Sequence, residues 1–123
     1  MAKELSPAQQ LETFLKFIDL CASRYNFAYG NVALEDKRLQ DLLHEIEFAP
    51  GKAERNRAAT KLHHSRLIRR ENKDDVQRYE LIVKFFEDQN NRRTLNQLKQ
   101  LLGQQRKEEE YLSRERTYKP RVE

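Results

Sequence analysis

Apolar residues recur at intervals of three and four along most of this chain, and that spacing limits its fold more than any other feature. Residues at these intervals share one face of an α-helix, whereas a half-buried strand needs strict alternation of apolar and polar residues. No alternating segment is present. The clearest helical run is Leu11, Phe14, Leu15, Ile18, Cys21, Ala22, Tyr25 and Ala28. The sequence therefore predicts an all-α protein.

The three glycines and three prolines of the chain fall where helices are expected to begin and end. Ser6-Pro7 is typical of an N-cap followed by proline at the first helical position. Gly30-Asn31 is typical of a C-cap, and Pro50-Gly51 of a break between helices. We therefore expect one helix over residues 7–30 and a second over 31–50, lying antiparallel because their connection is short.

The stretch from residue 52 to residue 88 contains neither Gly nor Pro, and it predicts a long third helix. Its apolar stripe is interrupted between Leu62 and Val76, where Asn72 followed by acidic residues resembles a new helix start. We expect one continuous or kinked helix here. A polar break at Asp88–Arg92 then leads to a short fourth helix ending at Gly103. Because the apolar residues do not hold a strict heptad, we do not expect a long coiled coil.

These elements predict an antiparallel bundle of about four helices with a long central third helix. The bundle forms one domain over residues 1–103, because a chain of 123 residues has room for a single core. Residues 104–123 form a charged C-terminal helix or arm, which is marginal as a helix unless it docks.

The formal charge of +4 conceals an asymmetry between the two parts of the chain. The first 50 residues carry five basic and eight acidic side chains and the remainder has a net charge of +7. Opposed charges either pair within the fold or attract different partners. Pairing within the molecule is the favoured interpretation.

The third helix carries the first candidate surface, a basic segment that lacks a continuous apolar stripe. Such a segment is suited to binding phosphates or an acidic protein surface. The residues around Gly103 do not match the pattern of a helix-turn-helix motif. Pairing with the acids of the first 50 residues is the alternative. The candidate partner- or phosphate-binding residues are Arg55, Arg57, Lys61, Arg66, Arg69, Arg70 and Lys73.

The C-terminal arm is the second candidate surface. Tyr and Arg side chains dominate the binding energy of protein interfaces once they lose water. The arm suits folding on binding or exchange between protomers, with a frayed tail as the alternative. Its candidate contact residues are Arg106, Tyr111, Leu112, Arg114, Arg116, Tyr118 and Arg121.

No set of residues predicts a catalytic, metal or cofactor site. His63 and His64 are adjacent, so they point about 100° apart on a helix and do not share a metal. Cys21 lies on an apolar face without an evident base, and a single cysteine is typical of the reducing cytoplasm. No apolar run approaches the length that spans a membrane, so we expect a cytoplasmic protein without a membrane partner.

The predicted function is non-catalytic: an adaptor or inhibitor that docks on a larger, nucleic-acid-associated protein through the basic helix and the C-terminal arm. Short, highly charged helical chains of this kind are common among accessory proteins of phages and mobile elements. Two alternatives stay open. One is direct binding of DNA or RNA by a homodimer through its basic helices, and the other is a self-assembling structural subunit.

Overall fold

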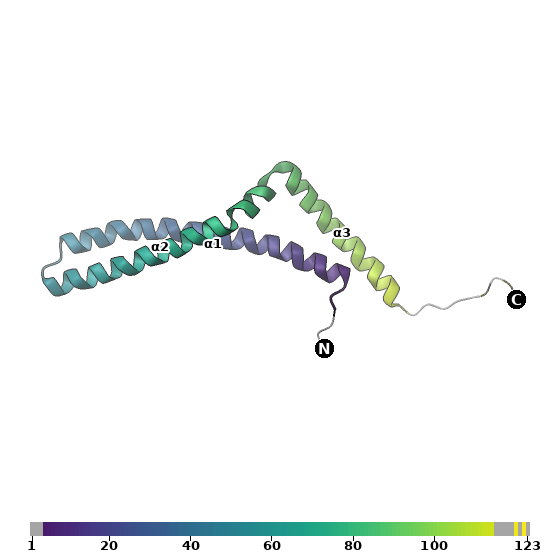
Figure 1. The fold of residues 1–123 in the computed structure, drawn as a ribbon, viewed down its shortest axis with the longest axis horizontal. Helices are drawn as coiled ribbons and strands as arrows, with labels where there is room; N and C mark the ends of the chain where they lie inside the picture. Colours follow the sequence, from purple (N-terminus) through teal and green to yellow (C-terminus); the bar gives the residue numbers. More distant parts are fainter. Residues whose placement is uncertain (1–3, 115–119, 121, 123) are drawn as a thin grey trace. The chain divides into compact units, whose positions relative to one another are not determined.

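The computed structural model describes residues 4–114, 120 and 122, and within them the fold is entirely helical. The helices are α1 (Pro7–Glu47), α2 (Lys52–Glu87) and α3 (Gln89–Ser113) (Figure 1). No strand occurs in this part of the chain. The all-α prediction is therefore confirmed, whereas the expected count of about four helices is not met among the described residues.

Helix α1 passes through Gly30 without a break, so the predicted helices over 7–30 and 31–50 are one helix. No glycine in the described part of the chain has the positive φ that a glycine C-cap adopts. A glycine inside a helix costs only about 1 kcal/mol, which packing along the rest of the helix offsets. The expectation of two antiparallel neighbours joined at Gly30 is consequently wrong.

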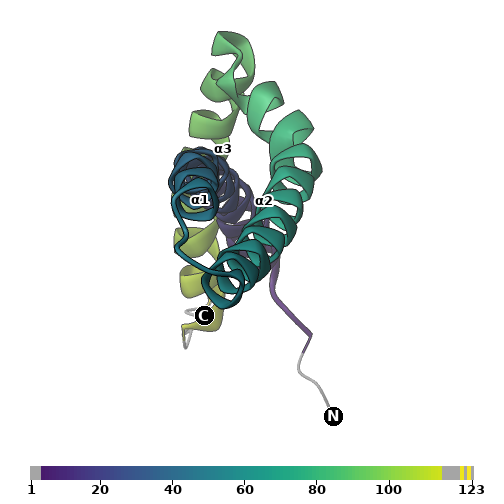
Figure 2. The same cartoon turned by 90° about the vertical axis from the view of Figure 1, so that its left-hand side faces the viewer.

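Contacts divide the chain into two compact units, and Ile18–Phe85 forms the larger one. In this unit the greater part of α1 and nearly all of α2 lie side by side in opposite directions, joined by residues 48–51 (Figure 2). The predicted break at Pro50-Gly51 is confirmed, and so is the continuous long helix from Lys52. We call this unit the hairpin.

The inward side chains of α1 in the hairpin repeat at alternating intervals of three and four. That average of 3.5 residues is the seam of a coiled coil. The apolar residues of α1 by themselves do not hold this repeat, because the polar Glu35 occupies one position in the middle of the seam. The buried or half-buried seam residues are Ile18, Cys21, Tyr25, Ala28, Val32, Glu35, Leu39, Leu42 and Ile46.

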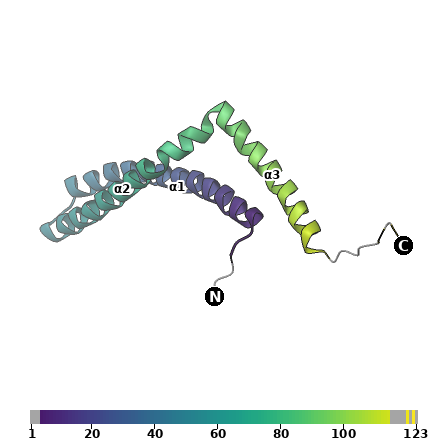
Figure 3. The same ribbon diagram turned by 45° about the vertical axis from the view of Figure 1, so that its right-hand side comes forward.

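The smaller unit combines the described residues of Met1–Phe17 and Phe86–Glu123, so it joins the start of α1 to α3 (Figure 3). Its buried apolar side chains are Ala8, Leu15, Leu95 and Leu102. Helix α3 continues through Gly103 to Ser113, so the helix end predicted at that glycine is wrong. The domain division after residue 103 stays a prediction.

Local capping chemistry fixes the starts of α1 and α3. Ser6 Oγ accepts a hydrogen bond from the Gln9 amide at 3.2 Å, and Gln9 Oε1 accepts one from the Ser6 amide at 2.9 Å. This reciprocal pair is a capping box. Asp88 caps α3 by accepting from the Asn90 and Asn91 amides. The start of α1 agrees with the sequence-based boundary, whereas α3 begins at Gln89, inside the polar break that was expected over Asp88–Arg92.

Candidate functional site

A buried polar group interrupts the apolar seam of the hairpin. Glu35 on α1 is 3% exposed and Ser65 on α2 is 2% exposed. Ser65 Oγ donates a hydrogen bond to Glu35 Oε2 at 2.5 Å, and Arg38 Nη1 lies 2.6 Å from Glu35 Oε1. Arg66 Nη2 donates to the Glu35 backbone carbonyl at 3.0 Å. Because a buried carboxylate is costly without partners, this network defines which residues of α1 and α2 face each other.

Further polar contacts join the two helices on either side of this network. Arg69 Nε lies 2.6 Å from Asp36 Oδ1, and Lys61 Nζ lies 3.5 Å from Glu45 Oε1. Asn31 donates to Asn72 Oδ1 at 3.2 Å, and Asn72 in turn donates to the Ile68 carbonyl at 2.8 Å. Asn72 therefore connects α2 to α1. It lies inside the continuous helix α2 and does not start a new helix.

Pairing within the molecule therefore accounts for part of the basic segment. Lys61, Arg66 and Arg69 contact α1, as the interpretation of the charge asymmetry favoured. Arg57 pairs within α2, with Nη2 3.4 Å from Glu54 Oε1. The remaining three candidates, Arg55, Arg70 and Lys73, are exposed and form no ion pair with the described residues.

Two adjoining hollows lie beside the polar network, and Lys73 lines both. The first, of about 280 Å³, is lined mainly by Tyr29, Val32, Ala33 and Val76, together with Asp36. The second, of about 530 Å³, is lined by Arg66, Arg69, Arg70, Lys73, Asp74 and Gln77. The fold thus places an apolar hollow directly next to a strongly basic one. Sequence reasoning found the bases but missed the apolar hollow, because its walls come from both helices.

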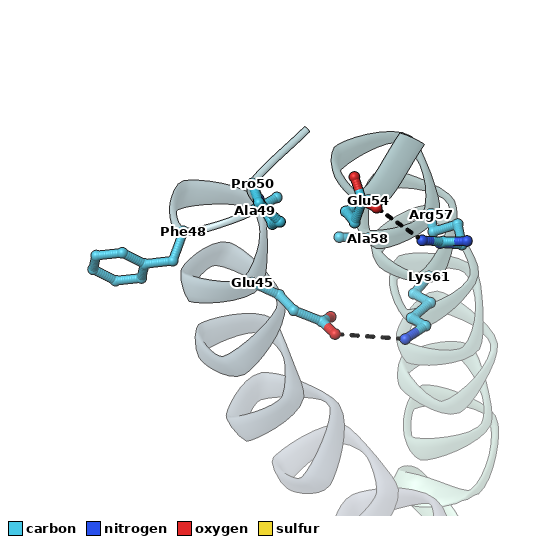
Figure 4. Close-up of a pocket in the computed structure, with 8 residues that line it drawn as sticks. All are labelled: Glu45, Phe48, Ala49, Pro50, Glu54, Arg57, Ala58 and Lys61. Atoms are coloured by element: carbon cyan, nitrogen blue, oxygen red, sulfur yellow. Dashed lines mark hydrogen bonds and ion pairs between the residues drawn. The ribbon is translucent and has the colours of Figure 1, made fainter. Parts of the chain in front are cut away.

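A third hollow, of about 350 Å³, lies at the closed end of the hairpin (Figure 4). Its walls include the Lys61–Glu45 pair across the helices and the Arg57–Glu54 pair within α2. Phe48 points away from it and is largely exposed (Figure 4). The charges around this hollow are mutually balanced, so it lacks the positive excess of the hollow at Arg70.

A row of exposed apolar side chains follows the outer side of α1 in the hairpin. Leu20 is 47% exposed, Phe27 is 72% exposed and Leu34 is 49% exposed. Their seven-residue spacing places them on one face of the helix, away from the inward seam. Sequence analysis missed this row, although the spacing of 20, 27 and 34 was a readable signal. We call these three side chains the outer row.

Residues 104–113 of the C-terminal arm belong to α3, and two of them contact the start of α1. Arg106 Nη2 lies 3.2 Å from Glu12 Oε2. Glu109 Oε2 accepts from the Ala8 amide at 2.8 Å and from Gln105 Nε2 at 3.0 Å. The side chain of Ser6, with Gln105 and the Ala8 amide, lowers the pKa of Glu109. Lys16 and then Arg106 lower the pKa of Glu12 in the same way.

The other predicted arm contacts divide into exposed residues and residues outside the description. Arg114 pairs with Glu110 at 2.8 Å, one turn away on the same helix. Tyr111 and Leu112 are exposed on α3. Arg116, Tyr118 and Arg121 lie outside the described residues. Among the seven predicted arm residues, Arg106 joins α3 to the start of α1 through its ion pair with Glu12.

Metal binding and thiol reactivity can be judged from the described residues. They contain no group of three or more His, Cys, Asp or Glu side chains arranged to hold a metal ion. Burial raises the pKa of the Cys21 thiol, which disfavours the reactive thiolate. No described helix combines the length and the apolar character needed to cross a membrane.

No protein-family model matches this chain, and no curated protein or solved structure is significantly similar to it. The function proposed below therefore depends on the contacts and exposed surfaces of the molecule.

Proposed function

We propose that this protein is a non-catalytic adaptor or inhibitor whose hairpin docks against a helix of a larger protein. The observation that carries this proposal is the outer row. Exposed large apolar side chains on a regular face mark interaction sites, because water contact with them is unfavourable. The seven-residue spacing matches the repeat at which a facing helix presents its own apolar side chains.

The internal use of the basic residues also supports a protein partner. Nucleic-acid binding requires Arg and Lys side chains whose positive charge is free to contact phosphates. Lys61, Arg66 and Arg69 already contact α1, so the basic segment offers fewer free charges than its sequence suggests. The outer row supports docking on a protein. That this partner is associated with nucleic acid is an expectation that comes only from the composition of the chain.

Site-specific crosslinking tests this proposal. A photoreactive phenylalanine analogue at position 27 is expected to crosslink one other protein in the host cell, and Phe27→Ser is expected to abolish its capture. The matched control is Leu81, which is 83% exposed on α2 of the same hairpin. The same analogue at position 81 should give no such adduct, and Leu81→Ser should retain capture.

Two results would contradict the proposal. One is unchanged capture by Phe27→Ser with helicity preserved. The other is an adduct between two copies of the chain, with mass that rises with concentration in light scattering. The second result would support the self-assembling subunit instead.

Direct nucleic-acid binding is a second candidate, favoured by the free charges of Arg55, Arg70 and Lys73. A random DNA duplex and an RNA hairpin, titrated at low and physiological salt, test it. Reversing Arg66 and Arg69 would damage the contacts between α1 and α2, so Arg70→Glu with Lys73→Glu is the appropriate variant. Steeply salt-dependent binding that this double variant abolishes would support the candidate. Absence of binding at low salt would eliminate it.

A further inference from the structure

We propose that the two hollows flanking Lys73 form one binding site for an acidic peptide segment that carries a single large apolar side chain. The apolar side chain, Leu or Phe, enters the hollow walled by Val32, Ala33 and Val76. Carboxylates within one helical turn of it meet the basic hollow. The site lies entirely within the hairpin and goes beyond the docking surface proposed above.

The bases of the site combine fixed and free charges. Asp36 holds the Arg69 guanidinium at 2.6 Å, and the Glu35 carbonyl holds Arg66 Nη2 at 3.0 Å. Arg66 Nε is buried and has no hydrogen-bond partner, so its donor capacity is unmet. Arg70 and Lys73 form no ion pair with described residues, which leaves their charge available to a ligand. Arg66 and Arg69 therefore hold the wall of the basic hollow in place, while Arg70 and Lys73 supply the charge that meets the ligand carboxylates.

The apolar hollow decides between an acidic peptide and a nucleic acid. Its walls are mainly aliphatic, and single-stranded nucleic acids bind through aromatic platforms on which successive bases stack. Tyr29 is the one aromatic side chain that lines it. A phosphate backbone would bind the Arg and Lys side chains and leave the apolar hollow empty. An acidic peptide with a Leu or Phe fills both the basic hollow and the apolar hollow.

This site and the outer row lie on different sides of α1. Tyr29 follows Phe27 by two residues, so their side chains point about 160° apart around the helix. One partner segment on the outer row would therefore leave the hollows open. Two faces that accept different segments fit an adaptor that contacts two sites at once.

A peptide pool tests the site with the full-length protein. Each peptide of the pool contains one Leu or Phe among Asp and Glu residues, and the pool covers every spacing between the apolar residue and the acidic residues. Fluorescence anisotropy measures binding. We expect at least one member to bind at micromolar concentration. Replacing its apolar residue by Ala, or its acids by Asn and Gln, should weaken binding at least tenfold.

Protein variants locate the site. Arg70→Glu with Lys73→Glu should weaken peptide binding at least tenfold, and Ala33→Trp should do the same by filling the apolar hollow. Arg92→Glu with Arg93→Glu makes the same charge change on exposed residues of α3 and should leave binding unchanged. Phe27→Ser should also leave it unchanged, which separates this proposal from the docking of the outer row.

Three outcomes would overturn the inference. The first is that no member of the pool binds to the folded protein. The second is that removal of the apolar residue leaves affinity unchanged, since the contact would then be charge alone. The third is that random single-stranded DNA binds more tightly than every peptide and loses binding in the Arg70/Lys73 variant.

Discussion

Replacing Ser65 by alanine removes the one hydroxyl that donates to the buried Glu35 carboxylate. The hydrogen bond measures 2.5 Å, and both residues are at most 3% exposed. Water therefore does not replace the lost donor freely. Hydrogen bonds to charged groups contribute about 1.5–3 kcal/mol, so Ser65→Ala should lower the free energy of unfolding by about 2 kcal/mol.

Urea unfolding followed by circular dichroism measures this loss. With an m-value of about 2 kcal/mol/M, the midpoint should fall by about 1 M. Ser23→Ala is the control, because Ser23 is exposed on α1 of the same hairpin. It should change stability by at most about 0.5 kcal/mol, in the favourable direction, since alanine is the better helix former.

A double variant tests whether the loss comes from the Glu35 carboxylate oxygen that Ser65→Ala leaves without a donor. Glu35→Leu with Ser65→Ala replaces both partners by apolar groups, and such replacements are often neutral or stabilising. The double variant should therefore regain most of the stability that Ser65→Ala loses. If Ser65→Ala falls within about 0.5 kcal/mol of the wild type, or if the double variant is less stable than Ser65→Ala, the reasoning about this network is wrong.

Three further predictions follow from the helices and their ends. Gly30→Ala and Gly103→Ala should each raise stability by about 0.5–1 kcal/mol in thermal unfolding, because the added Cβ meets no atom within 4 Å. Gly51→Ala should give no such gain, because Gly51 precedes α2 and accepts its first hydrogen bond, and glycine is preferred to alanine at a helix N-cap; equal gains at all three sites would contradict the argument. The pKa of Glu109 is lowered in the fold, so its stabilising contribution is complete above the unfolded value of about 4.3 and is lost as pH falls through the lower folded value. The urea midpoint should accordingly drop less between pH 6 and pH 3 in Glu109→Gln than in the wild type, and parallel pH profiles would refute this. Cys21 is buried with a raised pKa, so a thiol reagent should modify it only as urea unfolds the protein; reaction of the native protein at the rate of a free thiol would show that the site opens.

The features that local chemistry determines could be predicted from the sequence. Ser6-Pro7 and Pro50-Gly51 mark helix ends because capping and chain breaks need only neighbouring residues, whereas the N-cap role of Asp88 is seen only in the structure. Gly30 was misread because glycine permits a C-cap without requiring one. Whether the helix continues depends on packing against α2, which the neighbouring residues do not reveal.

The seam and the hollows could not be predicted because they depend on which residues of α1 and α2 face each other. Glu35 looks like a surface residue until Ser65, thirty positions later, supplies its donor. Arg66 and Arg69 look like free surface bases until α1 brings Glu35 and Asp36 to them. The general pairing of opposite charges was foreseen from the charge asymmetry, but the individual partners were not.

The smaller unit combines two segments that lie far apart in the sequence, so its contacts form late during biosynthesis. A growing chain emerges from the ribosome with its N-terminus first. The hairpin over residues 18–85 contains no residue of α3, so its internal contacts do not depend on the synthesis of that helix. The amide of Ala8 receives its acceptor only after Glu109 has been made. The first turn of α1 therefore waits for the 101 residues that separate Ala8 from Glu109, and a ribosome that stalls before α3 leaves this end of α1 without its acceptor.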